Sequence, residues 1–248
     1  MSLSVLVLGS GDAFGSGGRL QTCFHVTAPE RTFLVDCGST ALIAMRRHGV
    51  DPNGLDLVVL SHLHGDHFGG LPFLVLDAQL VSRRAEPLTV AGPPGTERRV
   101  HELMEATFPG SAGARRRFEL RFAELEPGER TDLGGVAVAP QEVVHPSGAP
   151  SLALRIECGG CVLAYTGDTE WTDALLPVAR DADLLIAEAY TFDKRVPYHL
   201  DLATLEANRE RLGARRIALT HLGADMVARS ADLDWEVLED GRTIALPG

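Results

Sequence analysis

Three histidines and one aspartate fall within six residues, in the segment His62-Leu63-His64-Gly65-Asp66-His67. Imidazole nitrogens and carboxylate oxygens are common donors to zinc and related divalent cations in proteins. Alternate side chains of an extended segment point to the same side, so we expect His62 and His64 to bind one ion together. Asp66 and His67 then turn toward a second ion nearby. The segment therefore predicts a metal site rather than a surface loop that happens to be rich in histidine.

The elements that must position these side chains are strands. An apolar run at residues 55–60 precedes the histidine segment and predicts a buried strand. Three further candidate ligands each stand just past a predicted apolar strand: His145, Asp168 and His221. A histidine at the end of a strand is usually structural when it stands alone. Here the same placement recurs three times, which favours one shared site.

The predicted strands fall into two groups, each followed by helices, which indicates two β-sheets packed face to face with helices outside, a layered α/β architecture. With 248 residues, 45% of them hydrophobic, the chain is long enough for one large domain over residues 1–248. Cys158 and Cys161 flank Gly-Gly between two alternating apolar runs. We interpret this CxxC spacing as a two-residue hairpin turn rather than a redox pair or half of a zinc site.

The formal net charge of −11 argues against broad electrostatic capture of nucleic acid, although a local basic patch is compatible with it. Arginine pairs and runs are predicted to lie on solvated faces, at residues 83–84, 98–99, 115–117 and 215–216. No apolar run approaches the length of a membrane span, and no basic-then-apolar signal pattern opens the sequence. These observations predict a cytoplasmic protein without a membrane partner.

The chain resembles the metallo-β-lactamase fold superfamily in three segments. Residues 61–71 match the signature loop, residues 165–169 match the loop that carries a bridging aspartate, and residues 219–221 match the final histidine. The resemblance implies a four-layer αββα sandwich with a dinuclear metal site at the sheet edge. It implies that one ion is held by His62, His64 and His145, that the other is held by Asp66, His67 and His221, and that Asp168 bridges them. The cofactors would be two divalent ions, zinc in the first instance, with manganese or iron as alternatives.

An aspartate rather than a cysteine at position 168 points away from true β-lactamases and toward glyoxalase II and ribonuclease Z. The sequence is most similar to the ribonuclease Z-like and phosphodiesterase branch, through residues 8–11, 34–38, 71–72, 188–190 and 198–201. The resemblance implies that His199 protonates the leaving group and that Glu188 holds it. Asp66 would orient or deprotonate the nucleophile while it also binds metal. A packing or helix-entry role for His199 is the alternative.

The resulting hypothesis is hydrolysis of a phosphodiester by in-line attack of a metal-bridging hydroxide. The extended glycine- and proline-rich arm with which ribonuclease Z grips tRNA is not found in this sequence. A small-molecule or short phosphodiester substrate is therefore expected, tRNA is doubtful, and a homodimer is expected by analogy only. Specificity is expected to reside in the loops at residues 78–85, 109–117 and 191–197.

Two other functions compete with this hypothesis. A glyoxalase II-like hydrolase of thioesters or lactones would use the same ligands to polarise a carbonyl group. The pair of Glu188 and His199 favours the phosphodiester, because a thiolate leaving group does not need a proton donor. A non-catalytic metal-binding module is disfavoured because all seven candidate ligands are present.

Overall fold

Two seven-stranded sheets form the centre of the molecule in the computed structural model, which describes residues 3–247. The first sheet has the order β14-β1-β2-β3-β4-β5-β6. Its strands are β1 (Leu3–Gly9), β2 (Cys23–Thr27), β3 (Thr32–Val35), β4 (Leu57–Val59), β5 (Leu88–Gly92), β6 (Leu120–Glu124) and β14 (Thr243–Leu246). The second sheet has the order β13-β12-β11-β10-β9-β8-β7. Its strands are β7 (Thr131–Asp132), β8 (Ala137–Val143), β9 (Ser151–Cys158), β10 (Cys161–Tyr165), β11 (Leu184–Glu188), β12 (Ile217–Thr220) and β13 (Glu236–Val237).

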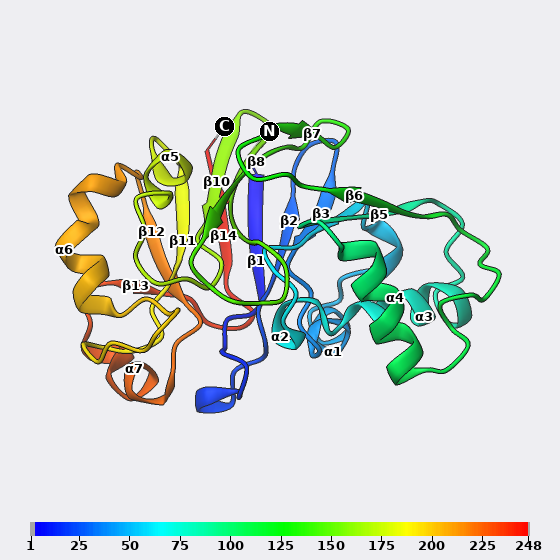
Figure 1. Ribbon diagram of the computed structural model, residues 1–248, viewed down its shortest axis with the longest axis horizontal. Helices are drawn as coiled ribbons and strands as arrows, with labels where there is room; N and C mark the ends of the chain where they lie inside the picture. Colours follow the sequence, from blue (N-terminus) through cyan, green and yellow to red (C-terminus); the bar gives the residue numbers. More distant parts are fainter. Residues whose placement is uncertain (1–2, 248) are drawn as a thin grey trace.

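Helices cover the outer faces of both sheets. Those that follow strands of the first sheet are α1 (Ala41–Arg47), α2 (Gly65–Phe68), α3 (Leu71–Leu80) and α4 (Thr96–Thr107). Those that follow strands of the second sheet are α5 (Leu175–Ala179), α6 (Leu202–Leu212) and α7 (Ala224–Arg229). The two groups lie on opposite sides of the sheets (Figure 1). Short 3₁₀ turns lie at Ser16–Gly18, Pro52–Gly54 and Ser230–Asp232. The predicted four-layer αββα sandwich is confirmed.

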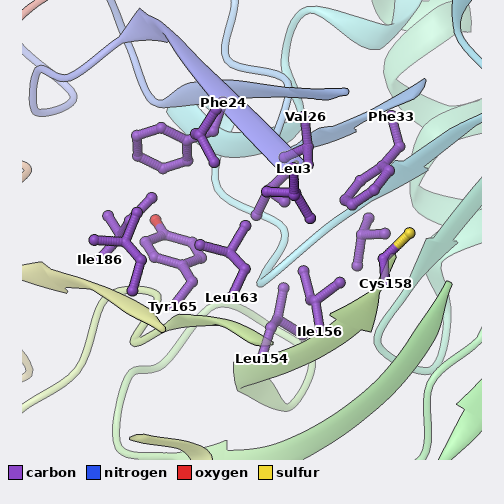
Figure 2. Packing of buried hydrophobic residues seen from close by; sticks show 14 of the residues in the cluster. Leu3, Phe24, Val26, Phe33, Leu154, Ile156, Cys158, Leu163, Tyr165 and Ile186 are labelled. Carbon is purple, nitrogen blue, oxygen red and sulfur yellow. The ribbon is translucent and has the colours of Figure 1, made fainter. Parts of the chain in front are cut away.

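Three apolar clusters separate these layers. The central cluster lies between the sheets, where Phe24 and Phe33 of the first sheet face Leu154, Ile156 and Tyr165 of the second (Figure 2). Alternation along each strand produces this arrangement, because side chains two residues apart share a face. The other two clusters lie under the helices, one beneath α1, α3 and α4 and one beneath α5, α6 and α7. Burial of apolar surface at all three levels fixes the strand ends that carry the candidate ligands.

The hairpin interpretation of the CxxC segment is confirmed. Cys158 pairs directly with Cys161 across the β9–β10 turn, and Gly159 and Gly160 both have positive φ angles. Both cysteines are buried free thiols. The division of strands into consecutive groups has one exception. The last strand, β14, returns to the first sheet and pairs antiparallel with β1.

Two local predictions need correction. Arg84 does not lie on a solvated face: its side chain is 3% exposed. Its three guanidinium nitrogens donate hydrogen bonds to the backbone carbonyl oxygens of residues 52, 53, 55, 86 and 87, at 2.5–3.2 Å. Burial is tolerated because the whole guanidinium is hydrogen-bonded. The loop expected at residues 78–85 begins late, because α3 continues to Leu80. No helix within the described residues 3–247 is long and apolar enough to cross a membrane.

Candidate active site

The histidine segment follows β4, as predicted, but it is extended only at its start. His64 keeps extended backbone angles and caps the single turn of α2, which contains Asp66 and His67. This change of backbone conformation turns the last two side chains away from the first two. His62 and His64 consequently fall in one group with His145, and Asp66 and His67 fall in another with Asp168 and His221.

In the first group, His64 Nδ1 lies 3.0 Å from His145 Nε2. His145 Nδ1 donates a hydrogen bond to the Tyr198 carbonyl oxygen at 2.9 Å, which leaves Nε2 with its lone pair. His62 is fully buried, and burial is the main reason why its pKa is well below the usual value. A neutral imidazole is the form that binds metal, so all three side chains are suited to one cation.

In the second group, Asp168 lies between the two sets of histidines. Its Oδ2 atom is 3.1 Å from His221 Nε2, 3.4 Å from His67 Nε2 and 4.0 Å from His62 Nε2. Asp66 Oδ2 lies 3.2 Å from His67 Nε2 and 3.9 Å from His221 Nε2. Two carboxylates and two imidazoles therefore converge on one point, and Asp168 also faces the other group.

The donors in both groups fit divalent metal. Nitrogen and oxygen donors about 2.0–2.1 Å from a tetrahedral zinc lie about 3.3 Å from one another, and several spacings here are close to that value. His62 Nε2, His67 Nε2 and Asp168 Oδ1 are buried and have no hydrogen-bond partner within residues 3–247. Buried polar atoms without partners are costly. Cations held by the two groups would satisfy them.

The charge balance of the second group is consistent with this interpretation. Burial alone would lower the pKa of His67, but the carboxylates of Asp168, Asp66 and Asp36 raise it well above the usual value. Burial would raise the pKa of Asp168, but His221 and His67 hold it well below the usual range. Without metal, the carboxylates are therefore balanced by protons on imidazoles. A divalent cation would displace those protons.

Two buried residues that sequence reasoning left without a role orient the ligands. Asp36, just after β3, accepts hydrogen bonds from His67 Nδ1 at 2.7 Å and from the Ser61 backbone and hydroxyl groups, each at 2.8 Å. Ser61 Oγ in turn lies 3.0 Å from His62 Nδ1. Carboxylates that fix the tautomer of a ligating histidine in this way are typical of metal sites. An aspartate directly after an apolar strand was the available signal.

His221 is held in an uncommon conformation. Its φ angle is +57°, in the left-handed region of backbone conformation that residues other than glycine rarely adopt. Its backbone N–H donates to the Ser10 carbonyl at 3.0 Å, and its Nδ1 lies 3.2 Å from Thr22 Oγ1. The surrounding loops thus fix both the backbone and the ring. Gly38 belongs to the same loop packing, because a Cβ atom there would lie only 2.4 Å from the Asp66 carbonyl oxygen.

Glu188 and His199 form a pair beside this cluster. Glu188 is the last residue of β11, and His199 lies in the loop between β11 and α6. His199 Nδ1 donates to Glu188 Oε1 at 2.5 Å, and Glu188 Oε2 accepts from the backbone N–H groups of Thr169 and Leu200. Glu188 is fully buried, whereas His199 is partly exposed. The His199 ring stacks nearly parallel to His221 at a centroid distance of 6.2 Å. A cavity of about 220 Å³ opens here, lined by His64, Asp66, His145, Asp168, His199 and His221 together with Ala13, Phe14 and Tyr190.

Comparison with known proteins identifies the family of this chain. A family model for the beta-lactamase superfamily domain matches residues 31–222, which is most of the chain. The chain belongs to the beta-lactamase superfamily. The resemblance seen in the sequence is thereby confirmed, and the two-sheet sandwich is the metallo-β-lactamase fold.

Individual relatives of this superfamily member cover nearly its whole length. It is 29% identical to a ribonuclease Z of Halorubrum lacusprofundi, over 96% of this chain and 92% of that protein. The crystal structure of the short form of human tRNase Z has a TM-score of 0.81 at 22% identity, covering 99% of this chain and all of that one. A diphosphatase from the PhnP family has a TM-score of 0.79 at 20% identity, covering 98% and 97% of the two chains.

Proposed function

We propose that this superfamily member is a metal-dependent hydrolase of phosphodiester bonds. The observation that supports this proposal most directly is the hydrogen-bonded pair of His199 and Glu188 beside the cluster of seven candidate ligands. A phosphodiester with an alkoxide leaving group needs a proton donor at the leaving oxygen, and a partly exposed imidazole at the cavity wall can supply one. The names of the relatives, ribonuclease Z and a diphosphatase, support the same reaction class.

The ligand assignment is part of the proposal. His62, His64 and His145 would hold one divalent cation, and Asp66, His67 and His221 would hold a second, with Asp168 between them. Zinc is the cation that this donor set suits best. Bound there, the cations would acidify a water molecule and offset negative charge on the phosphoryl group.

The protein's own side chains have three tasks in this scheme. Asp66, the least buried of the carboxylates in its group, faces the cavity and orients the attacking water. His199 gives a proton to the departing oxygen from Nε2, because Glu188 holds the Nδ1 side of the ring. Asp36 keeps His67 in the tautomer that leaves Nε2 free.

A short substrate is favoured over tRNA. The alignment with the Halorubrum ribonuclease Z spans 293 positions, more than the 248 residues of this chain, so that relative carries inserted segments that are missing here. The net charge of −11 also works against capture of a long polyanion. The cytoplasmic location and the homodimer expected from the sequence stay predictions.

The test is to compare turnover of a phosphodiester, a thioester and a lactone by the zinc-loaded protein under identical conditions. The proposal predicts hydrolysis of bis(p-nitrophenyl) phosphate and little cleavage of the other two. Exclusive cleavage of the thioester or the lactone would show that the glyoxalase II-like alternative is correct.

A further inference from the structure

His199 lines a second and larger cavity besides the one that holds the candidate ligands. This cavity has a volume of about 580 Å³ and lies between the loop of residues 195–201 and helix α6. Its wall includes Trp171 and Arg195, and we call it the Trp171 cavity. Sequence reasoning placed specificity in the 191–197 loop but gave Trp171 no role. One imidazole thus faces the reaction centre and a space large enough for an organic group.

The walls of the Trp171 cavity include an indole side chain and a guanidinium group. The Trp171 ring is partly buried, and the Arg211 guanidinium lies 5.5 Å from its centroid. Asp173 in turn binds Arg211 at 2.9 Å. Arg195 is exposed and has no carboxylate partner within 4.0 Å among residues 3–247.

Two carboxylates also line the cavity, and both are already engaged. Asp201 is 5% exposed and accepts hydrogen bonds from the backbone and hydroxyl groups of Thr204, each at 2.7 Å. Glu170 Oε2 accepts from the Tyr198 backbone at 3.3 Å. Their presence disfavours a second phosphate in the cavity. An uncharged ring system with polar edges suits the indole and the guanidinium better, because planar bases stack on aromatic side chains and accept hydrogen bonds from arginine.

We propose that the Trp171 cavity binds the leaving group of the substrate and that this leaving group is a nucleoside. This inference rests on the proposed phosphodiesterase function. In the step, the water oxygen bonds to phosphorus while the bond from phosphorus to the nucleoside oxygen breaks. His199 gives its proton to that oxygen, and the proton lost by the water passes to solvent. The nucleoside oxygen must then lie at His199, and its base extends into the Trp171 cavity, which His199 also lines.

The test compares two phosphodiesters that yield the same thymidine 5′-phosphate and differ only in the leaving alcohol. One is deoxyadenylyl-(3′→5′)-thymidine, which releases deoxyadenosine, and the other is the methyl ester of thymidine 5′-phosphate, which releases methanol. The p-nitrophenyl ester of thymidine 5′-phosphate serves as the reference for phosphodiesterase activity. We expect kcat/KM of the dinucleotide to exceed that of the methyl ester by at least about tenfold.

Substitutions of cavity residues test whether the preference for the dinucleotide arises in the Trp171 cavity. Trp171→Ala is expected to lower kcat/KM for the dinucleotide by about 5- to 150-fold, the range for loss of one stacked base, and to leave the methyl ester within about twofold. Arg195→Ala is expected to lower it about tenfold. The matched controls are Lys194→Ala, an exposed neighbour that is not among the cavity residues, and Trp235→Ala, which lies at a different cavity. Both should leave the ratio of the two substrates unchanged.

A binding measurement removes the dependence on turnover. The sequence has two tryptophans, so in Trp235→Phe the indole fluorescence reports Trp171 alone. Titration with deoxyadenosine should quench it. Two results would overturn the cavity assignment and leave the phosphodiesterase proposal standing. One is unchanged fluorescence on titration with deoxyadenosine. The other is equal kcat/KM for the dinucleotide and the methyl ester while the p-nitrophenyl ester is cleaved. Failure to cleave any of the three esters would overturn the phosphodiesterase proposal, and the leaving-group role with it.

Discussion

The carboxylate of Asp36 accepts a hydrogen bond from His67 Nδ1 at 2.7 Å, and both side chains are fully buried. The same carboxylate accepts from Ser61, which adjoins the first candidate ligand, His62. One residue outside the ligand set thus supports both groups of ligands. It does so from the end of β3, which runs parallel to β4, so that the loops after the two strands lie side by side.

Asp36→Asn is therefore expected to weaken zinc binding by about 10- to 100-fold, because supporting residues of this kind orient the ligand and raise its basicity. Zinc affinity measured by competition with a chelator tests this expectation. Asp56→Asn is the matched control. Asp56 accepts a hydrogen bond from the Thr32 backbone N–H at 2.9 Å and forms a half-exposed ion pair with Arg31, and it contacts none of the candidate ligands. Equal affinities of the two variants would contradict the role given to Asp36.

His199→Ala is expected to discriminate between leaving groups. Loss of a general acid costs about 10²- to 10⁴-fold when the departing oxygen needs a proton, and much less when it leaves as a stable anion. Hydrolysis of an alkyl phosphodiester should therefore fall by about that factor, while hydrolysis of a p-nitrophenyl ester falls little. Equal losses on both substrates would indicate that His199 supports the fold or the metal instead.

Zinc binding is expected to tighten as pH rises through neutrality. Burial lowers the pKa of His67 and of His221, but neighbouring carboxylates raise both above the usual histidine value. In the metal-free protein these two imidazoles hold protons that zinc must displace, so protons are released on binding. Calorimetry at about pH 7 in buffers of different ionisation enthalpy measures this release. A binding heat that is independent of the buffer would show that the imidazoles were already neutral.

Arg84→Lys is expected to destabilise the fold by about 2–4 kcal/mol. The guanidinium supplies hydrogen bonds to five carbonyls, and a lysine ammonium has three donors, so buried acceptors would be left unpaired. Chemical denaturation gives the free energy of unfolding. Arg83→Lys, at the exposed neighbouring position, should change it by no more than about 0.5 kcal/mol.

The layers of the fold and the placement of the candidate ligands at the ends of strands were accessible from the sequence, because both depend on local patterns. Apolar alternation marked the strands, and ligand-type residues directly after them marked one sheet edge. The role of Asp36 was not accessible, because it depends on β3 and β4 being neighbours in the sheet. The Trp171 cavity was missed for a similar reason, since it joins a residue before α5 to residues of the 195–201 loop and α6.

The ends of helices were also difficult to predict, because local sequence signals mark them only weakly. The helix α3 is apolar on nearly all sides, with Phe73 and Leu80 exposed, so it lacks the periodicity that marks an amphipathic helix. Burial of Arg84 could not be foreseen, because its five carbonyl partners come from two separate turns of the chain. The prediction that paired arginines lie in solvent rested on residue type alone, and it was therefore wrong for Arg84.

The measurement that tests the central claim most directly is the metal content and phosphodiesterase activity of Asp168→Ala. Asp168 faces both groups of ligands, so its loss should lower the zinc retained per chain and reduce bis(p-nitrophenyl) phosphate hydrolysis by about 10³-fold. Asp56→Ala, expressed and purified in parallel, should match the wild type in both. A folded Asp168→Ala protein with full zinc content and full activity would contradict the two-cation site.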